Sequence, residues 1–124
     1  MRPGKFVLSA AMSAAALLGA SPAMAHAKLV SSSPPANATV APPQAISLTF
    51  SEALAPAFST ADLVMIGGKM DMKVPVRITI SKDGKTLVAT PQGKVVPGAY
   101  RINWAVTSAD DGHKLTGKVA FKVS

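Results

Sequence analysis

The sequence contains no cysteine. A chain without cysteine forms no disulfides, so its fold depends on the hydrophobic core alone. The same absence restricts any metal site to histidine, methionine, carboxylate or backbone ligands. Thiolate sites of the zinc-ribbon type are therefore excluded.

Clusters of basic residues are also lacking, although the formal net charge is +7. The lysines and arginines stand singly along the chain, and only one tryptophan and one tyrosine occur. A nucleic-acid surface gathers basic residues on one face, commonly with aromatic side chains among them. The sequence therefore predicts no nucleic-acid partner, and the charge favours solubility.

Long apolar runs are confined to the first 25 residues. Arg2 and Lys5 precede an apolar stretch over residues 6–20, and Ala23-Met24-Ala25 follows it. This order is typical of a secretory signal peptide that is cleaved before His26. An uncleaved N-terminal anchor is the alternative, but the stretch is short for a membrane span.

We therefore predict that residues 1–25 are removed on export to the periplasm. Residues 26–124 then remain as a single domain, which is long enough for one hydrophobic core. Its formal charge would be +5, because Arg2 and Lys5 leave with the signal peptide.

A sustained helical period is absent from residues 26–124, where short apolar stretches alternate with turn signals. Apolar side chains at every second position, as in Tyr100-x-Ile102-x-Trp104, give a strand one core face and one water face. We interpret Trp104 as a core residue rather than a platform for a ligand. Asp83-Gly84 is typical of a hairpin turn. The sequence thus predicts an all-β, Ig-like sandwich with seven strands. The predicted strands are 28–32, 46–51, 61–66, 74–80, 86–90, 99–107 and 116–123.

Histidine occurs only at positions 26 and 113. Signal cleavage would give His26 a free α-amino group beside its imidazole, and the two nitrogens can close a chelate ring on one metal ion. An α-amine has a pKa of roughly 8, so a divalent metal can displace its proton near neutral pH. A solvated terminus without a ligand role is the alternative.

The segment 108–113 places two aspartates and the second histidine around a glycine. In Asp111-Gly112-His113 the spacing allows a carboxylate and an imidazole to converge from one turn. Together with two nitrogens of His26 they would form a tetragonal nitrogen and oxygen set, which favours copper(II). A polar surface turn, in which the aspartates cap backbone N–H groups, is the alternative.

On these residues the chain resembles the CopC-type family of periplasmic copper-binding, copper-resistance proteins. The resemblance extends over nearly all of residues 26–124 and depends on a combination of motifs. The matching stretches are His26-Ala27-Lys28-Leu29-Val30-Ser31-Ser32-Ser33-Pro34, Leu48-Thr49-Phe50-Ser51-Glu52, Ala61-Asp62-Leu63-Val64-Met65, Gly98-Ala99-Tyr100-Arg101-Ile102-Asn103-Trp104 and Asp111-Gly112-His113-Lys114-Leu115-Thr116-Gly117.

The resemblance implies a cupredoxin-like, seven-stranded Greek-key β-sandwich or barrel that binds copper(II) at one end. The implied ligands are the amine and ring of His26, a carboxylate oxygen of Asp111 and the imidazole of His113. Glu52 falls at the family's acidic position near this site, where it would orient the N-terminal amine or the outer shell of the metal. A solvated charge after a strand is the alternative for Glu52.

Family members with a second site bind copper(I) in a methionine-rich loop, often with a histidine. The corresponding segment here contains Met65, Met70 and Met72, together with Lys69 and Lys73, but no histidine. Thioethers suit copper(I). However, Met65 can equally be a core residue, and nearby cations disfavour a bound cation. We therefore expect a weak copper(I) site at most.

The favoured function is a non-catalytic copper(II) carrier or buffer in copper homeostasis and resistance. The resemblance implies copper ion as the ligand and an inner-membrane CopD-type transporter as a partner, and we expect a monomer. A copper-dependent enzyme of the lytic polysaccharide monooxygenase type is one alternative, because such enzymes also chelate copper with an N-terminal histidine. One tryptophan and one tyrosine offer little aromatic surface for a polysaccharide, however. A structural Ig-like module with incidental histidines is the other alternative.

Overall fold

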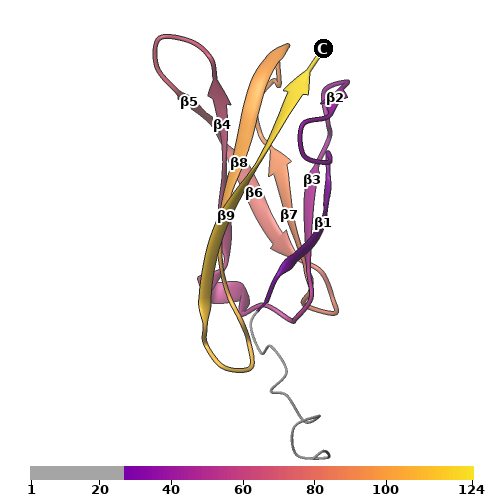
Figure 1. The fold of residues 1–124 in the computed structure, drawn as a ribbon, viewed down its shortest axis with the longest axis vertical. Helices are drawn as coiled ribbons and strands as arrows, with labels where there is room; N and C mark the ends of the chain where they lie inside the picture. The colour runs from indigo at the N-terminus through magenta and orange to yellow at the C-terminus, as the bar shows by residue number, and fades with distance from the viewer. Residues whose placement is uncertain (1–26) are drawn as a thin grey trace, which may run out of the picture.

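The computed structural model describes residues 27–124, which form nine β-strands and one short 3₁₀ helix (Figure 1). These residues contain no helix that is long and apolar enough to span a bilayer. In chain order the elements are β1 (Leu29–Ser33), β2 (Thr39–Val40), β3 (Ile46–Phe50), η1 (Pro56–Phe58), β4 (Thr60–Ile66), β5 (Met72–Val74), β6 (Val76–Ile80), β7 (Thr86–Pro91), β8 (Gly98–Thr107) and β9 (Lys114–Val123).

The strands form two sheets that face each other (Figure 1). One sheet has the order β1-β3-β7-β6, and the other has the order β2-β9-β8-β4-β5. Paired strands are antiparallel, except that β2 runs parallel to the end of β9. The predicted all-β Greek-key sandwich is confirmed.

Six of the predicted strands agree with the structure to within two residues at each end. The prediction of one strand over residues 74–80 is wrong, because the chain divides there into β5 and β6, which lie in different sheets. Pro75 separates them, since proline has no N–H to continue a ladder. Strand β2 was not predicted. It has two residues and pairs only with the distant end of β9.

The predicted hairpin turn joins β6 to β7, which pair antiparallel. Gly84 adopts a φ of 79°, which favours glycine. The Asp83 carboxylate accepts hydrogen bonds from the Ser81 hydroxyl (2.6 Å) and the Lys85 N–H (3.0 Å). The Gly84 carbonyl in turn accepts the N–H of Leu54 (2.8 Å), so the hairpin also supports the segment that follows β3.

Trp104 lies in the core between the two sheets, as predicted. Its side chain is 7% exposed, and its ring meets that of Phe50 edge to face with centroids 5.0 Å apart. Gly117 is the register partner of Trp104 on β9, and a Cβ at Gly117 would collide with the indole ring. A glycine is needed there because the ring occupies the space of a side chain.

Candidate metal centre

Residues 108–113 form the loop between β8 and β9, at the lower end of the sandwich in Figure 1. The Ser108 N–H donates to the His113 carbonyl (2.8 Å), and the Gly112 N–H donates to the Ser108 carbonyl (3.0 Å). Gly112 has a φ of 71°, a conformation that other residues rarely adopt. The loop is therefore a closed turn in which Asp111 and His113 are held close together.

Asp111 contacts His113 through both carboxylate oxygens. Oδ1 accepts the His113 backbone N–H (3.1 Å), and Oδ2 lies 3.0 Å from the ring nitrogen Nδ1. The His113 side chain is 58% exposed and that of Asp111 is 28% exposed, so an ion can reach both. The backbone N–H of His113 is the main cause of the lowered pKa of Asp111, and the His113 ring adds to the effect. The carboxylate therefore stays ionised to more acidic pH than usual.

Two further segments meet this loop at the same end of the sandwich. Lys28 is paired with Ser51: its N–H donates to the Ser51 hydroxyl (3.0 Å), and its carbonyl accepts the Ser51 N–H (2.9 Å). Two residues later, the Ala53 carbonyl accepts the N–H of Ala109 in the loop (2.9 Å). Half-buried Glu52 lies between these two anchors. The start of the described chain, Glu52 and the Asp111 loop are thus neighbours.

His26 lies outside the described residues, as does the predicted signal peptide. Within residues 27–124, no group of three or more histidine, aspartate or glutamate side chains is close enough together to hold a metal ion. Of the predicted ligands, Asp111 and His113 are within the described residues, and their side chains are in contact. Two ligands are fewer than the four of a tetragonal site.

The model of the CopC domain family matches residues 29–124. The chain belongs to the CopC family. Copper resistance protein C of Xanthomonas campestris pv. juglandis is 44% identical over 113 residues, which cover 88% of each chain. Copper resistance protein C of Pseudomonas syringae pv. tomato is 41% identical over 114 residues, or 89% of this chain and 90% of the relative.

Among solved structures, the chain is similar to PcoC, described as a methionine-rich copper resistance protein from Escherichia coli. The TM-score is 0.73 at 39% identity, over 80% of this chain and 99% of PcoC. The predicted CopC resemblance is thus confirmed. The prediction of a non-catalytic protein agrees with these names, since each of the three relatives is named for copper resistance and not for a reaction.

The three methionines among the described residues of this CopC chain are Met65, Met70 and Met72, which lie at the opposite end of the sandwich, near the β4–β5 loop (Figure 1). Met65 pairs with Met72 across the two strands, but Met65 is packed against the core and its methyl group lies over Gly98. Met70 and Met72 are 74% and 63% exposed. Met65 therefore has a packing role that the other two methionines do not share.

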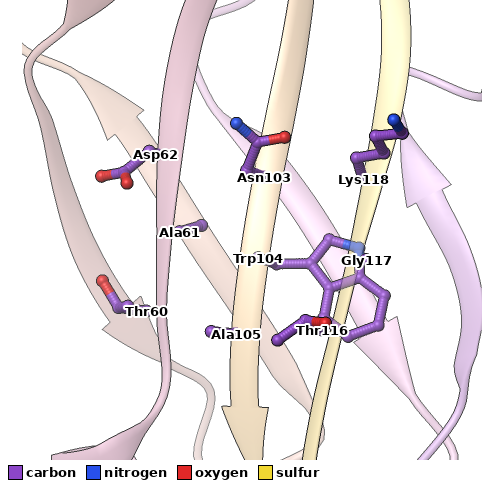
Figure 2. A pocket seen from close by; sticks show the side chains of 9 residues that line it. All are labelled: Thr60, Ala61, Asp62, Asn103, Trp104, Ala105, Thr116, Gly117 and Lys118. Carbon is purple, nitrogen blue, oxygen red and sulfur yellow. The ribbon is translucent and has the colours of Figure 1, made fainter.

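A depression of about 470 Å³ crosses β4, β8 and β9 on the second sheet (Figure 2). Asp62, Asn103 and Lys118 lie side by side along it, one from each strand. It contains no histidine or methionine, and Asp62 forms an ion pair with Lys73 (3.6 Å). The depression is therefore separate from the candidate metal centre.

The contacts that hold the backbone together at this end of the sandwich were not identified from the sequence. Ser51 forms hydrogen bonds with the backbone of Lys28, and the Ala53 carbonyl accepts a hydrogen bond from the Ala109 N–H of the loop. Both residues are next to Glu52 in the sequence. Their roles depend on backbone contacts between residues far apart in sequence, which no local pattern reveals. The buried Ser108 is a third residue of this kind.

Proposed function

We propose that the mature chain binds one copper(II) ion through the α-amine and imidazole of His26, a carboxylate oxygen of Asp111 and the imidazole of His113. The observation that carries the proposal is the 3.0 Å separation of Asp111 Oδ2 and His113 Nδ1. Two ligands about 2.0–2.1 Å from one ion and at a right angle to each other lie roughly 2.9 Å apart. The pair therefore already has the spacing of neighbouring ligands in a tetragonal site.

The position of Ala27 supports the two remaining ligands. Ala27 is 2% exposed, and the next residue is fixed to Ser51 beside Glu52. The Cα atom of His26 must lie about 3.8 Å from that of Ala27. The new N-terminus would then begin at the end of the sandwich that carries Asp111 and His113, and no long flexible segment would separate the ligands.

Glu52 is proposed to hold the N-terminal amine in place. Its neighbours on either side, Ser51 and Ala53, contact Lys28 and the loop residue Ala109, so the Glu52 backbone lies between the two contacts. An amine that binds copper(II) keeps N–H groups that can donate hydrogen bonds to a carboxylate. Such outer-shell hydrogen bonds orient ligands and raise metal affinity.

We propose the biological role of a copper(II) carrier or buffer in the periplasm that contributes to copper resistance. The names of the CopC relatives support copper resistance. All four proposed ligand atoms come from a terminus and one exposed loop, which suits reversible exchange with a partner. An inner-membrane CopD-type transporter is the proposed partner, and the carrier is proposed to act as a monomer.

The described residues offer the enzymatic alternative a single largely exposed aromatic ring, that of Phe58 (71% exposed). A polysaccharide monooxygenase needs exposed aromatic rings around its copper to hold the substrate. Trp104 is 7% exposed and Tyr100 is fully buried, where its hydroxyl donates to the Val96 carbonyl (2.6 Å). Neither ring can therefore contact a polysaccharide.

A competition titration of the mature protein with a copper(II) chelator tests the proposed function. We expect a single equivalent of copper(II) to bind, with ligands that release protons as the ion enters. A parallel titration with copper(I) should show much weaker binding. Absence of a saturable copper(II) site would contradict the proposal.

Replacing Met70 and Met72 with leucine is expected to leave copper(II) affinity unchanged and the free energy of unfolding within about 0.5 kcal/mol of the wild type. Both side chains are exposed and lie at the end opposite to Asp111. Chemical denaturation and the same titration measure the two quantities. A tight 1:1 copper(I) complex that disappears in this double variant would show that the methionines form a true site.

Acidification is expected to release copper(II), because each ligand must be deprotonated to bind. The nitrogen ligands take up protons at a higher pH than a carboxylate does, because a carboxyl group is the stronger acid. The pKa of Asp111 is lowered by the His113 N–H, so its carboxylate remains ionised below the ordinary value of 3.8 and is the last ligand to be lost. The amount of bound copper(II), measured from pH 8 to 3, should decrease as the pH falls below about 6.5. Binding that persists unchanged at pH 3 would exclude histidine ligands.

A further inference from the structure

Ser51 follows the end of β3 and binds the backbone at the beginning of the described chain. Its hydroxyl accepts the Lys28 N–H (3.0 Å), and its own N–H donates to the Lys28 carbonyl (2.9 Å). Lys28 directly precedes β1, which starts at the same end of the sandwich as the β8–β9 loop (Figure 1). Two hydrogen bonds to one serine therefore hold the start of β1 at the end that carries the candidate metal centre.

The Ser51 side chain here takes the place of a backbone group. Strands β1 and β3 are antiparallel and Leu29 lies opposite Phe50, so Lys28 and Ser51 are the next pair along the two strands. In a hydrogen-bonded antiparallel pair the two residues exchange two N–H···O=C bonds. The Lys28 N–H donates instead to the Ser51 hydroxyl. An alanine at position 51 could keep the bond from its own N–H but would lose the one to the hydroxyl.

Only His26 and Ala27 would precede Lys28 in the mature chain. Ala27 is 2% exposed and belongs to the hydrophobic core. Two residues of chain span no more than about 7 Å, so the Cα atom of His26 must lie within that distance of the Cα atom of Lys28. The position of Lys28 therefore limits where the amine and the imidazole of His26 can be.

We propose that Ser51 is a positioning residue for the copper(II) site. By holding Lys28, its hydroxyl keeps the two nitrogens of His26 beside the loop that carries the other proposed ligands. This inference rests on the proposed function. A chain end that is free before binding loses conformational entropy when it is ordered around an ion. A chain end that is already ordered loses less, and the affinity for the ion is higher.

The test compares three variants of the mature protein in competition titrations with a copper(II) chelator. Ser51→Ala is expected to bind copper(II) roughly tenfold more weakly, as losing an outer partner of a ligand commonly does. Ser51→Thr keeps a hydroxyl and should restore the affinity to within a few-fold of the wild type. Ser32→Ala is the matched control, because the Ser32 hydroxyl donates to the Pro34 carbonyl (3.0 Å) near the other end of β1. Its affinity should equal that of the wild type.

Thermal denaturation of the metal-free proteins checks that the variants fold. Ser51→Ala and Ser32→Ala each remove one hydrogen bond of a hydroxyl to the backbone. Each should therefore lower the Tm by no more than about 8 °C. Ser51 is exposed, so the alanine leaves no cavity in the core.

A second comparison separates positioning of His26 from a general effect on the fold. Ser51→Ala is also made in a chain with one alanine added before His26, in which the α-amine is no longer free to bind the ion. The effect of Ser51→Ala on copper(II) affinity should shrink there to within about threefold, because the hydroxyl acts through the His26 chelate. A general effect on the fold would weaken binding equally in both chains.

Three results would overturn the positioning role while the proposed function stands. They are wild-type affinity in Ser51→Ala, an equal loss of affinity in the mature and extended chains, and a Ser51→Thr variant that binds as weakly as Ser51→Ala. Failure of the wild type itself to bind copper(II) would contradict the proposed function, and the role of Ser51 with it.

Discussion

A mature chain that begins at His26 is expected to bind copper(II) at least about a hundredfold more tightly than the same chain with one alanine added before His26. The added residue converts the α-amine into an amide, which has no basic lone pair for the metal, and the chelate ring with the imidazole is lost. Losing an outer-shell partner alone typically weakens metal binding tenfold to hundredfold, and a direct ligand should cost more. Competition titrations of the two proteins measure the difference.

An alanine added after Ser124 is the matched control for this comparison. The C-terminus lies at the opposite end of the sandwich from the Asp111 loop (Figure 1), so this extension should not change the affinity. Equal affinities in the N-terminally extended and mature proteins would show that the amine of His26 is not a ligand. The uncleaved precursor is expected to resemble the extended protein.

His113→Ala is expected to weaken copper(II) binding by more than about a hundredfold while leaving the fold intact. Its imidazole is one of the proposed ligands, yet its side chain is 58% exposed and packs little against the core. Its backbone carbonyl bond to Ser108 is kept in the variant. The free energy of unfolding without metal should therefore change by less than about 1 kcal/mol.

Asp110→Asn is the control for His113→Ala, because it removes an exposed charge from the same loop without touching the proposed ligands. Its copper(II) affinity should remain within a few-fold of the wild type. Isothermal titration calorimetry gives the affinities, and thermal denaturation of the metal-free proteins gives the stabilities. Tight binding in His113→Ala would place the copper site elsewhere on the molecule.

Strands with clear alternation were predictable because burial on one face leaves a two-residue period in the sequence. Strand β8 shows this best, since Tyr100, Ile102 and Trp104 are all buried. The division at Pro75 was missed because apolar residues continue on both sides of the proline, and no local signal shows that they enter different sheets. Strand β2 was missed because its two residues are defined only by their parallel pairing with β9.

The candidate site was predictable where its geometry is local. The two-residue spacing of Asp111 and His113 indicated that their side chains would converge, and the structure brings Oδ2 and Nδ1 to 3.0 Å. The fixing of Lys28 by Ser51 was not predictable, since it links residues 23 positions apart. The buried hydroxyl of Ser108 was also missed, because a serine beside two aspartates has the sequence pattern of an exposed turn.

Electron paramagnetic resonance of the mature protein loaded with one equivalent of copper(II) tests the proposed copper site most directly. Hyperfine splittings count the nitrogens bound to the metal. We predict a single tetragonal species with three nitrogen ligands and one oxygen ligand. In His113→Ala the spectrum should show one nitrogen ligand fewer. A spectrum with fewer than three nitrogens, or one that is identical in the wild type and His113→Ala, would contradict copper binding by His26, Asp111 and His113.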